Sequence, residues 1–267
     1  MATTFHLEDV NSPVTPMTTD ELLPFEGTAS PHEVYAYQRR VGSLLYAATI
    51  TRLDVARTAA KLSEFLRNPS PRHSATADRA ITYLNGTKSL AIEYSPACNS
   101  RRVFMCASDA AFADDTVTRR STEGYLFQLF GGAVDWRSTK QHTVTTSSTE
   151  AELLALTHAT KEALWWKWFF KAILLDVGHS SAISCDNQQT IRLLTKDTPM
   201  LTTKLRHIDI QQHWLRQEVQ EGRIAINWVK TTEMPADGFT KALPRQRHEA
   251  FLSQLGLVDI GDRLEML

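Results

Sequence analysis

Apolar residues recur at steps of three and four positions between residues 32 and 88 of the chain. This spacing predicts amphipathic helices. The recurring apolar positions are Val41, Leu44, Leu45, Ala48, Val55, Ala59, Leu62, Phe65 and Leu66. The sequence Asn68-Pro69-Ser70-Pro71 ends the first helical segment, because proline cannot continue a helix. Pro71 is suited to the first turn of a second helix, which we expect to run to Leu84.

After residue 98 the helical spacing gives way to short apolar runs typical of β-strands. Three such runs lie at residues 103–107, 124–130 and 133–137, with a hairpin signal at Gly131-Gly132. One long helix is predicted at residues 149–175, with Thr149 as its cap. Further strands are predicted at 182–185 and 224–229, and further helices at 188–194, 208–219 and 235–242. This order predicts the α/β fold class, with a mixed sheet and flanking helices.

The predicted elements divide the chain into four segments. Residues 1–31 carry several prolines among Thr, Ser, Asp and Glu and show little periodicity, so we predict a linker there. Residues 32–98 form a small helical segment, and residues 99–244 form the α/β domain. Residues 245–267 are expected to form a C-terminal helix and a tail.

Composition narrows the class of protein. The 267 residues are 42% hydrophobic and 22% charged, which is typical of globular proteins and excludes a mainly disordered chain. No apolar run approaches the roughly 18 residues of a membrane span, and the N-terminus lacks a secretory or transit pattern. The three cysteines, Cys98, Cys106 and Cys185, are scattered, so we expect neither a disulfide framework nor a zinc site. The formal net charge of −1 gives no evidence for a nucleic-acid partner.

Four acidic residues lie where predicted strands end or predicted helices begin: Asp109, Glu152, Asp186 and Asp237. In an open α/β sheet, ligands bind at such positions. Converging carboxylates repel one another unless a cation offsets their charge, and Mg²⁺ prefers oxygen ligands. Two such ions roughly 4 Å apart can hold an attacking water and a leaving oxygen across a phosphodiester. Each acid taken alone is more typical of a cap or a turn residue, so the hypothesis depends on the set.

Short motifs surround the four acids and extend over residues 101–256. They are Ser108-Asp109-Ala110, Arg119-Arg120-Ser121-Thr122, Ser147-Ser148-Thr149-Glu150-Ala151-Glu152, Asp186-Asn187-Gln188, Arg206-His207-Ile208-Asp209-Ile210, Trp228-Val229 and Ala236-Asp237 with Phe239-Thr240-Lys241. As a set, they resemble the ribonuclease H region of copia-type LTR retrotransposon Pol polyproteins. Residues 16–94 resemble the segment after the polymerase palm in the same family, with Leu53 where that family usually has proline.

The resemblance implies a ribonuclease H-like fold, preceded by a helical remnant of the reverse transcriptase thumb or connection. It implies metal-dependent endonucleolytic hydrolysis of the RNA strand of RNA–DNA hybrids during retrotransposon reverse transcription. The metal-binding and catalytic acids would then be Asp109, Glu152, Asp186 and Asp237. The cofactor would be two Mg²⁺ ions, with Mn²⁺ as a substitute.

The implied partners are an RNA–DNA hybrid and the missing polymerase part of the polyprotein, with no membrane partner. The implied location is intracellular, either a cytoplasmic virus-like particle or the nucleus. Because the palm motifs are missing from this chain, we expect no polymerase activity from it. The alternative function is that of a catalytically silent, transposon-derived fragment that only binds nucleic acid.

One further acidic residue and one acidic motif are alternative candidates for the site. Glu150 lies two residues from Glu152, and two such side chains point in different directions from a helix, so both cannot face one site. We prefer Glu152 and interpret Glu150 as an acid that interacts with the helix dipole. Phe112-Ala113-Asp114-Asp115 imitates the aromatic-x-Asp-Asp hairpin of reverse transcriptases. We interpret it as a polar connection between two strands.

Other residue groups have both a functional and a structural interpretation. Cellular ribonuclease H proteins often carry a histidine in the loop before the last acid, whereas residues 230–236 contain none. His207 and His213 are candidate substitutes, although a structural role is more common for such helix histidines. Trp165, Trp166 and Trp168 are expected to belong mostly to the core or to a domain contact, with base stacking as the alternative. Local positive charge for a phosphate backbone would come from Arg101, Arg102, Arg119, Arg120, Arg137, Lys140 and Lys241.

Overall fold

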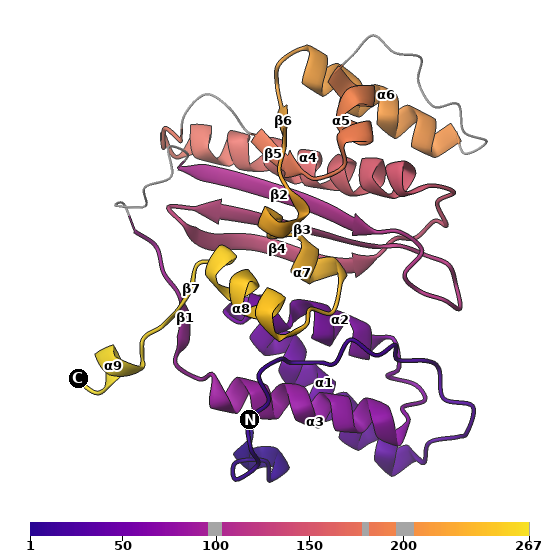
Figure 1. Ribbon diagram of the computed structural model, residues 1–267, viewed down its shortest axis with the longest axis vertical. Helices are drawn as coiled ribbons and strands as arrows, with labels where there is room; N and C mark the ends of the chain where they lie inside the picture. Colours follow the sequence, from indigo (N-terminus) through magenta and orange to yellow (C-terminus); the bar gives the residue numbers. More distant parts are fainter. Residues whose placement is uncertain (96–102, 178–181, 196–205, 267) are drawn as a thin grey trace. The chain divides into compact units, whose positions relative to one another are not determined.

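The computed structural model describes residues 1–95, 103–177, 182–195 and 206–266, with only the backbone for 206–208. The chain divides into two compact units (Figure 1). The first unit comprises Met1–Glu93 together with Lys241–Leu267, and the second comprises Tyr94–Thr240. Residues 245–267, predicted as a separate C-terminal helix and tail, thus belong to the same unit as the N-terminal helices.

The first unit is built on three helices, α1 (Pro31–Ile50), α2 (Ala56–Ser63) and α3 (Pro71–Gly86). Two of them begin with a serine cap and a proline in the first turn, Ser30 before Pro31 and Ser70 before Pro71. Their buried faces carry most of the apolar positions that the sequence spacing predicted, whereas Leu45 is exposed. The buried positions include Val41, Leu44, Ala59 and Leu62.

The first predicted helical segment is interrupted between α1 and α2 by a short 3₁₀ helix, Leu53–Val55. Arg52 and Asp54 form a buried ion pair there, with nitrogen–oxygen distances of 2.9 and 2.7 Å. The Arg52 guanidinium also donates to the Thr87 carbonyl at 2.9 Å. Buried charges must be paired, so the Arg52 and Asp54 side chains both point into the core. The backbone departs from α-helical geometry at these residues.

Residues 6–30, all of them described, contain no helix or strand, but hydrogen bonds attach them to the helices. Asn68 donates from its amide to the carbonyl of Phe25 at 3.1 Å, and Arg79 donates to the carbonyl of Thr15 at 3.1 Å. The stretch predicted as a linker is therefore packed against its own unit.

Two contacts hold the C-terminal segment in the first unit. Strand β1 (Leu90–Ile92) pairs antiparallel with β7 (Leu257–Asp259). In α8 (Arg245–Gln254), His248 lies 2.9 Å from the Tyr83 hydroxyl, and both side chains are buried. The last helix, α9, spans Gly261–Leu264. Neither strand was predicted, because three-residue strands leave no clear alternation in a sequence.

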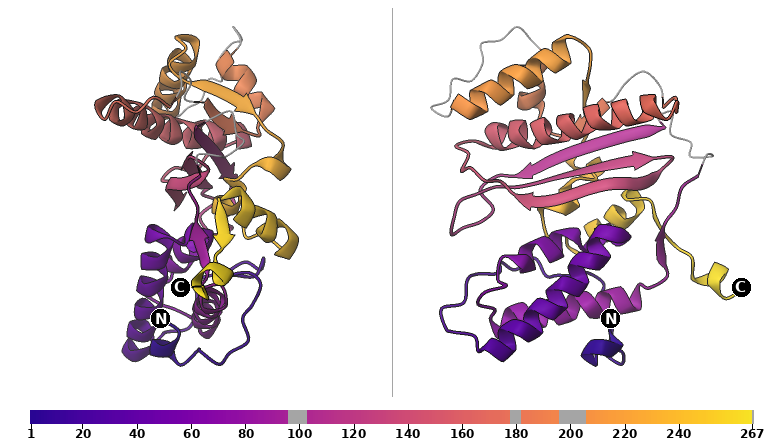
Figure 2. Two further views of the ribbon diagram at one scale, coloured as in Figure 1. Left: turned by 90° about the vertical axis from the view of Figure 1, so that its left-hand side faces the viewer. Right: turned by 180° about the vertical axis from the view of Figure 1, so that it is seen from behind.

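The second unit contains a five-stranded mixed sheet in the order β4-β3-β2-β5-β6. Strands β2 (Phe104–Ala111), β3 (Thr122–Leu129) and β4 (Gly132–Lys140) are antiparallel, whereas β5 (Ala182–Cys185) and β6 (Ala225–Trp228) run parallel to β2. Helix α4 (Ser148–Ala172) lies along the sheet, with α6 (Arg206–Gln220) beside it, and α5 (Gln188–Thr195) contacts both helices (Figure 2). The predicted α/β class with a mixed sheet and flanking helices is confirmed.

The core of this unit lies between α4 and the sheet. Phe127 of β3, Ile183 of β5, and Leu153 and Leu156 of α4 are fully buried there. The short helix α7 (Asp237–Thr240) contacts β2, β3 and β4. It approaches so closely at Gly124 that a Cβ on that residue would lie 2.6 Å from the Cβ of Phe239. A glycine is therefore required opposite α7.

Three local predictions differ from the structure. Strand β2 continues to Ala111, so Asp109 lies inside the strand and not after it. The hairpin turn is at Phe130-Gly131, both with positive φ, because a type I′ turn matches the twist of the paired strands. Helix α4 is capped by Ser147, whose hydroxyl accepts from the backbone N–H of Glu150, rather than by Thr149.

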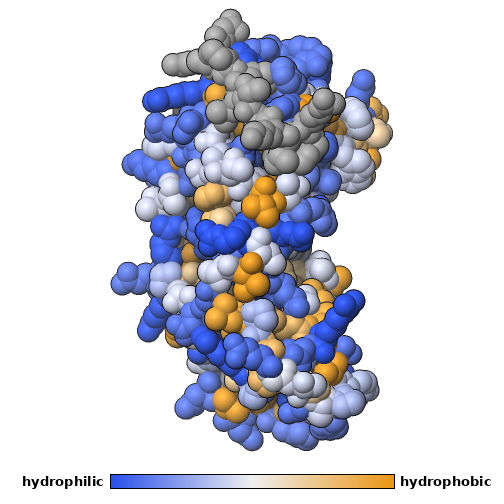
Figure 3. Space-filling model, turned by 90° about the vertical axis from the view of Figure 1, so that its right-hand side faces the viewer, coloured by the Kyte–Doolittle hydropathy of each residue, from blue (hydrophilic) through white to orange (hydrophobic). Residues whose placement is uncertain are grey.

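The described residues include no helix that is both long and apolar enough to cross a lipid bilayer. The face shown in Figure 3 is largely hydrophilic, with apolar side chains in small separate groups.

Candidate functional site

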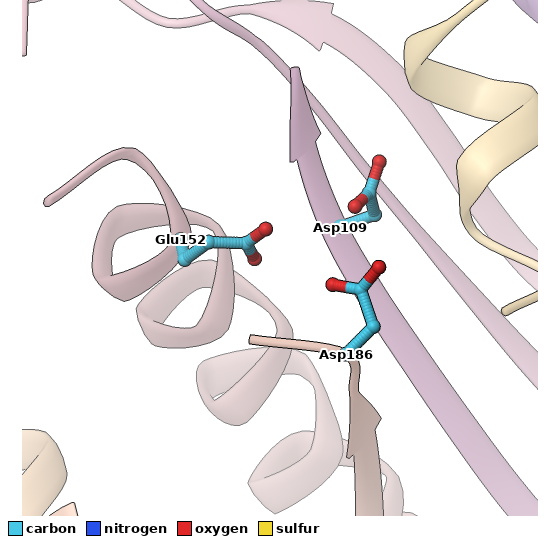
Figure 4. Close-up of side chains that lie close together, drawn as sticks. All are labelled: Asp109, Glu152 and Asp186. Carbon is cyan, nitrogen blue, oxygen red and sulfur yellow. The ribbon is translucent and has the colours of Figure 1, made fainter. Parts of the chain in front are cut away.

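Three carboxylates of the second unit meet at one place (Figure 4). Asp109 of β2, Glu152 of α4 and Asp186, which directly follows β5, each offer an oxygen within 4.8 Å of the others. Asp109 and Glu152 are buried, and Asp186 is partly exposed. A set of closely spaced carboxylate oxygens fits a hard divalent cation such as Mg²⁺, which prefers oxygen ligands and offsets their mutual repulsion.

The sheet register explains why two of these acids meet. Strands β2 and β5 are parallel neighbours, with Ala107 opposite Ser184. Continuing this register by two residues brings Asp109 beside Asp186. The local sequence therefore supplies both acids, and the pairing of strands far apart in the chain brings them together.

Helix α4 supplies the third acid and separates the two candidate glutamates. Glu150 accepts hydrogen bonds from the backbone N–H and the hydroxyl of Thr146, at 2.6 and 2.8 Å. The Glu150 carboxylate is therefore engaged in hydrogen bonds at the N-terminal end of α4. Glu152 points toward Asp109 and Asp186 instead (Figure 4).

Asp237 is not among the three acids with oxygens within 4.8 Å of one another. It is buried at the first position of α7. The same helix reaches the acid group through Thr240, whose hydroxyl donates to Asp109 Oδ2. The fourth predicted acid thus lies on an element that contacts the site without completing the close group.

Two residues that had no role assigned from the sequence, Thr231 and Trp228, contact Asp186. The Thr231 hydroxyl donates to Asp186 Oδ2 at 2.7 Å, and the Trp228 indole N–H donates to the Asp186 carbonyl at 3.1 Å. Residues 230–236 contain no histidine, but they do contain threonine hydroxyls that can donate hydrogen bonds. Trp228 and Thr231 lie at or just after the end of β6, the strand that pairs with β5. This position was the feature of the sequence that could have identified them as contacts of Asp186.

The Asp114-Asp115 motif is a structural part of the connection between β2 and β3. Asp114 accepts from the backbone N–H and the hydroxyl of Thr122, at 2.7 and 2.8 Å. Asp115 accepts from the backbone N–H groups of Val117 and Thr118 and from Lys140. Burial opposes ionisation, but the hydrogen bonds from Lys140 and Thr118 prevail and hold the pKa of Asp115 well below its usual range.

The remaining candidates are core residues, exposed residues or residues whose side chains the structure does not describe. Of the three tryptophans expected in the core or in a domain contact, Trp166 packs in the core against Phe104 and Phe170, whereas Trp165 and Trp168 are 50% and 68% exposed. His213 is exposed on α6. Arg119, Arg120, Arg137 and Lys241 are exposed as well. His207, Arg101 and Arg102 lie where the structure describes no side chains.

Comparison with known proteins gives relatives along most of the chain, although no family model matches it. The Pol polyprotein from the tobacco transposon TNT 1-94 is 34% identical over 221 residues, which are 83% of this chain and 16% of that protein. The Pol polyprotein from transposon RE1 of Arabidopsis thaliana is 31% identical over 253 residues, 94% of this chain and 17% of that protein. Secreted RxLR effector protein 161 of Plasmopara viticola is 44% identical over 129 residues, 48% of this chain and 89% of that protein.

Solved structures with a similar fold include LC11-RNase H1 in complex with an RNA/DNA hybrid. It covers 51% of this chain and 92% of its own, with 12% identity and a TM-score of 0.39. The foamy viral protease-reverse transcriptase dRH in complex with double-stranded DNA covers 77% of this chain and 34% of its own, with 16% identity and a TM-score of 0.44. Both TM-scores lie below 0.5.

The two transposon polyproteins differ from the effector in how much of this chain they match. They align with more than four fifths of it, and the chain spans about a sixth of their length. Because the second unit has 147 residues, alignments of 221 and 253 residues also include part of the first unit. This chain belongs to the family of retrovirus-related Pol polyproteins of transposons.

Proposed function

We propose that this chain hydrolyses the RNA strand of RNA–DNA hybrids in a reaction that requires Mg²⁺ or Mn²⁺. The observation that carries the proposal is the convergence of Asp109, Glu152 and Asp186 within 4.8 Å in a ribonuclease H-like sheet. Membership of the transposon Pol family supports it, because copying a transposon through reverse transcription produces such hybrids.

Each acid has a distinct position relative to an incoming strand. Asp109 is buried in the central strand of the sheet, and Asp186 is partly exposed beside it, so these two would hold the cation between the core and the solvent. Glu152 approaches from the helix and would complete the oxygen set. We assign it a second role, to orient the ribose 2′-hydroxyl, which distinguishes RNA from DNA. A bound divalent cation supplies an activated water and stabilises the charge on the cleaved phosphate.

Asp237 is our proposed ligand for a second cation. Its helix, α7, is tied to the site because Thr240 donates to Asp109 and Ser138 donates to the Phe239 carbonyl at 2.6 Å. Asp109 and Asp237 would hold this second cation, which would supply further stabilisation of the charge on the cleaved phosphate. The polymerase part of the polyprotein would be a partner that delivers the hybrid, and the reaction would take place inside the cell.

A cleavage assay tests the proposal. Purified protein is incubated with a labelled RNA–DNA hybrid, with single-stranded RNA or with duplex DNA, each with Mg²⁺ and with a chelator. We expect cleavage of the hybrid RNA alone, and only with Mg²⁺. Asp109→Asn should abolish cleavage, whereas the matched control Asp114→Asn, outside the acid group, should retain it.

Equal cleavage of duplex DNA would indicate a general nuclease and contradict the proposal. Binding of the hybrid without any cleavage would favour the silent nucleic-acid-binding fragment instead.

A further inference from the structure

Two threonine hydroxyls donate to two of the three converging carboxylates. Thr240 donates to Oδ2 of Asp109, and Thr231 donates to Oδ2 of Asp186 at 2.7 Å. Both threonines lie in the segment between β6 and α8, which supplies none of the three close acids. The same segment thus touches the acid group at two points through neutral hydrogen-bond donors.

The two contacts differ in their exposure to water. Thr240 is fully buried, and Asp109 is 1% exposed, so water does not compete for that hydrogen bond. Thr231 is exposed, and its bond to Asp186 is weaker for that reason. Trp228 adds a second bond at the same place by donating to the Asp186 carbonyl. The hydrogen bond from Thr240 to Asp109 is therefore the stronger of the two.

A hydroxyl that occupies one carboxylate oxygen determines how the other oxygen is directed. With Oδ2 of Asp109 bonded to Thr240, rotation of the carboxylate would break a buried hydrogen bond. Groups that orient metal ligands in this way commonly change metal affinity or activity by about 10- to 100-fold when they are removed. The effect requires no direct contact between the threonine and the cation.

We propose that Thr240 is a positioning residue that orients the Asp109 carboxylate for cation binding, and that Thr231 acts on Asp186 in the same way with a smaller effect. This inference rests on the proposed function, because it assigns a task to residues around the same acid group.

The docking of α7 does not depend on the Thr240 hydroxyl alone. Phe239 is fully buried against Gly124, and its carbonyl accepts a hydrogen bond from Ser138 at 2.6 Å. Valine has nearly the shape of threonine and lacks only the hydroxyl. Thr240→Val should therefore leave α7 in place while it releases the Asp109 carboxylate.

The experiment compares cation binding in four proteins: the parent chain, Thr240→Val, Thr240→Ser and Thr231→Val. Mn²⁺ binding is measured by electron paramagnetic resonance, and thermal unfolding in a chelator reports the stability of the fold. We expect Thr240→Val to weaken Mn²⁺ binding by about 10- to 100-fold and Thr231→Val by less than about tenfold. Thr240→Ser keeps the hydroxyl and should restore binding to near the parent value.

Thr157→Val is the matched control, because Thr157 is also buried and its hydroxyl donates at 2.7 Å to Leu153 in its own helix. It should lose a hydroxyl without weakening Mn²⁺ binding. If Thr240→Val binds Mn²⁺ as tightly as the parent, or if Thr240→Ser fails to restore binding, the positioning role is wrong. A parent chain that binds no Mn²⁺, or binds it equally after Asp109→Asn, would overturn the proposed function and this inference together.

Discussion

Replacing Asp109 with asparagine should make the protein more stable in a chelator and less responsive to magnesium. The three acids hold ligand oxygens within 4.8 Å of one another. At an effective dielectric constant of about 20, two unit charges at that distance repel by about 3.5 kcal/mol. Asp109 and Glu152 are both buried, so salt screens their repulsion less than it would at the surface. Asparagine removes one of these charges and keeps the shape of the side chain.

The substitution also has a cost. The hydrogen bond from Thr240 to a neutral amide oxygen is weaker than the bond to a carboxylate by about 1.5 kcal/mol. We count only the Asp109–Glu152 pair, because Asp186 is partly exposed and water weakens its interactions. The difference is a gain of about 2 kcal/mol, which corresponds to a rise in melting temperature of roughly 4–8 °C.

Magnesium should stabilise Asp109→Asn less than it stabilises the parent protein. A ligand that binds only the folded state stabilises it by about 1.4 kcal/mol for each tenfold excess over its dissociation constant. Asp109→Asn weakens that binding, so its melting temperature should rise less than that of the parent at every Mg²⁺ concentration.

Thermal unfolding followed by circular dichroism, in a chelator and across a Mg²⁺ titration, measures both effects. Asp114→Asn is the control, because its carboxylate bonds to Thr122 and lies outside the acid group. The reasoning fails if Asp109→Asn is destabilised in the chelator and keeps the full magnesium shift. Asp109 would then be a structural residue, and the cation would bind elsewhere.

Three further predictions concern single groups. Glu152→Gln should remove most hybrid cleavage, whereas Glu150→Gln should retain it and lower helix stability by about 1 kcal/mol, as judged by cleavage and urea unfolding. Alanine at both Asp114 and Asp115 should lower the melting temperature, because hydrogen bonds in the loop are lost. The folded fraction of this double variant should still cleave the hybrid. A loss of cleavage equal to that of Glu152→Gln would show that the site was misassigned. Burial lowers the pKa of His248, so the unfolded chain binds a proton more readily and stability should fall as the pH drops below about 6.5. His248→Gln should lose less stability between pH 7 and pH 5 in urea unfolding, and an unchanged pH dependence would contradict this account.

The sequence alone determined the local elements wherever the apolar period or the capping residues were clear. Pro71 marked the start of α3, and the strand at Ala182–Cys185 was predicted with its observed bounds. These features depend on residues close together in the chain, so local propensity and capping are sufficient to specify them. The family motifs are likewise short and local, which is why the resemblance to transposon Pol polyproteins could be recognised before any contact was known.

Element ends and long-range pairings could not be obtained in this way. The two short strands, β1 and β7, exist because Leu90–Ile92 and Leu257–Asp259 pair with each other, and neither has a pattern of its own. The extension of β2 past Asp109 depends on its pairing with β3 on one side, where Asp109 lies opposite Gly124. A strand continues for as long as its neighbour supplies hydrogen bonds, and a neighbour is a property of the fold.

The candidate site shows the same division. The sequence determined that acids stand at 109, 152, 186 and 237, but only the tertiary structure decided that the first three form the close group and that Glu150 bonds to Thr146 instead. It also revealed the contact between Asp109 and Thr240, which are 131 positions apart. Sequence periodicity describes the direction of a side chain within its own helix or strand. The distance between side chains on different elements is set by how those elements pack, and that distance decides which carboxylates repel, which accept hydrogen bonds and which can share a cation.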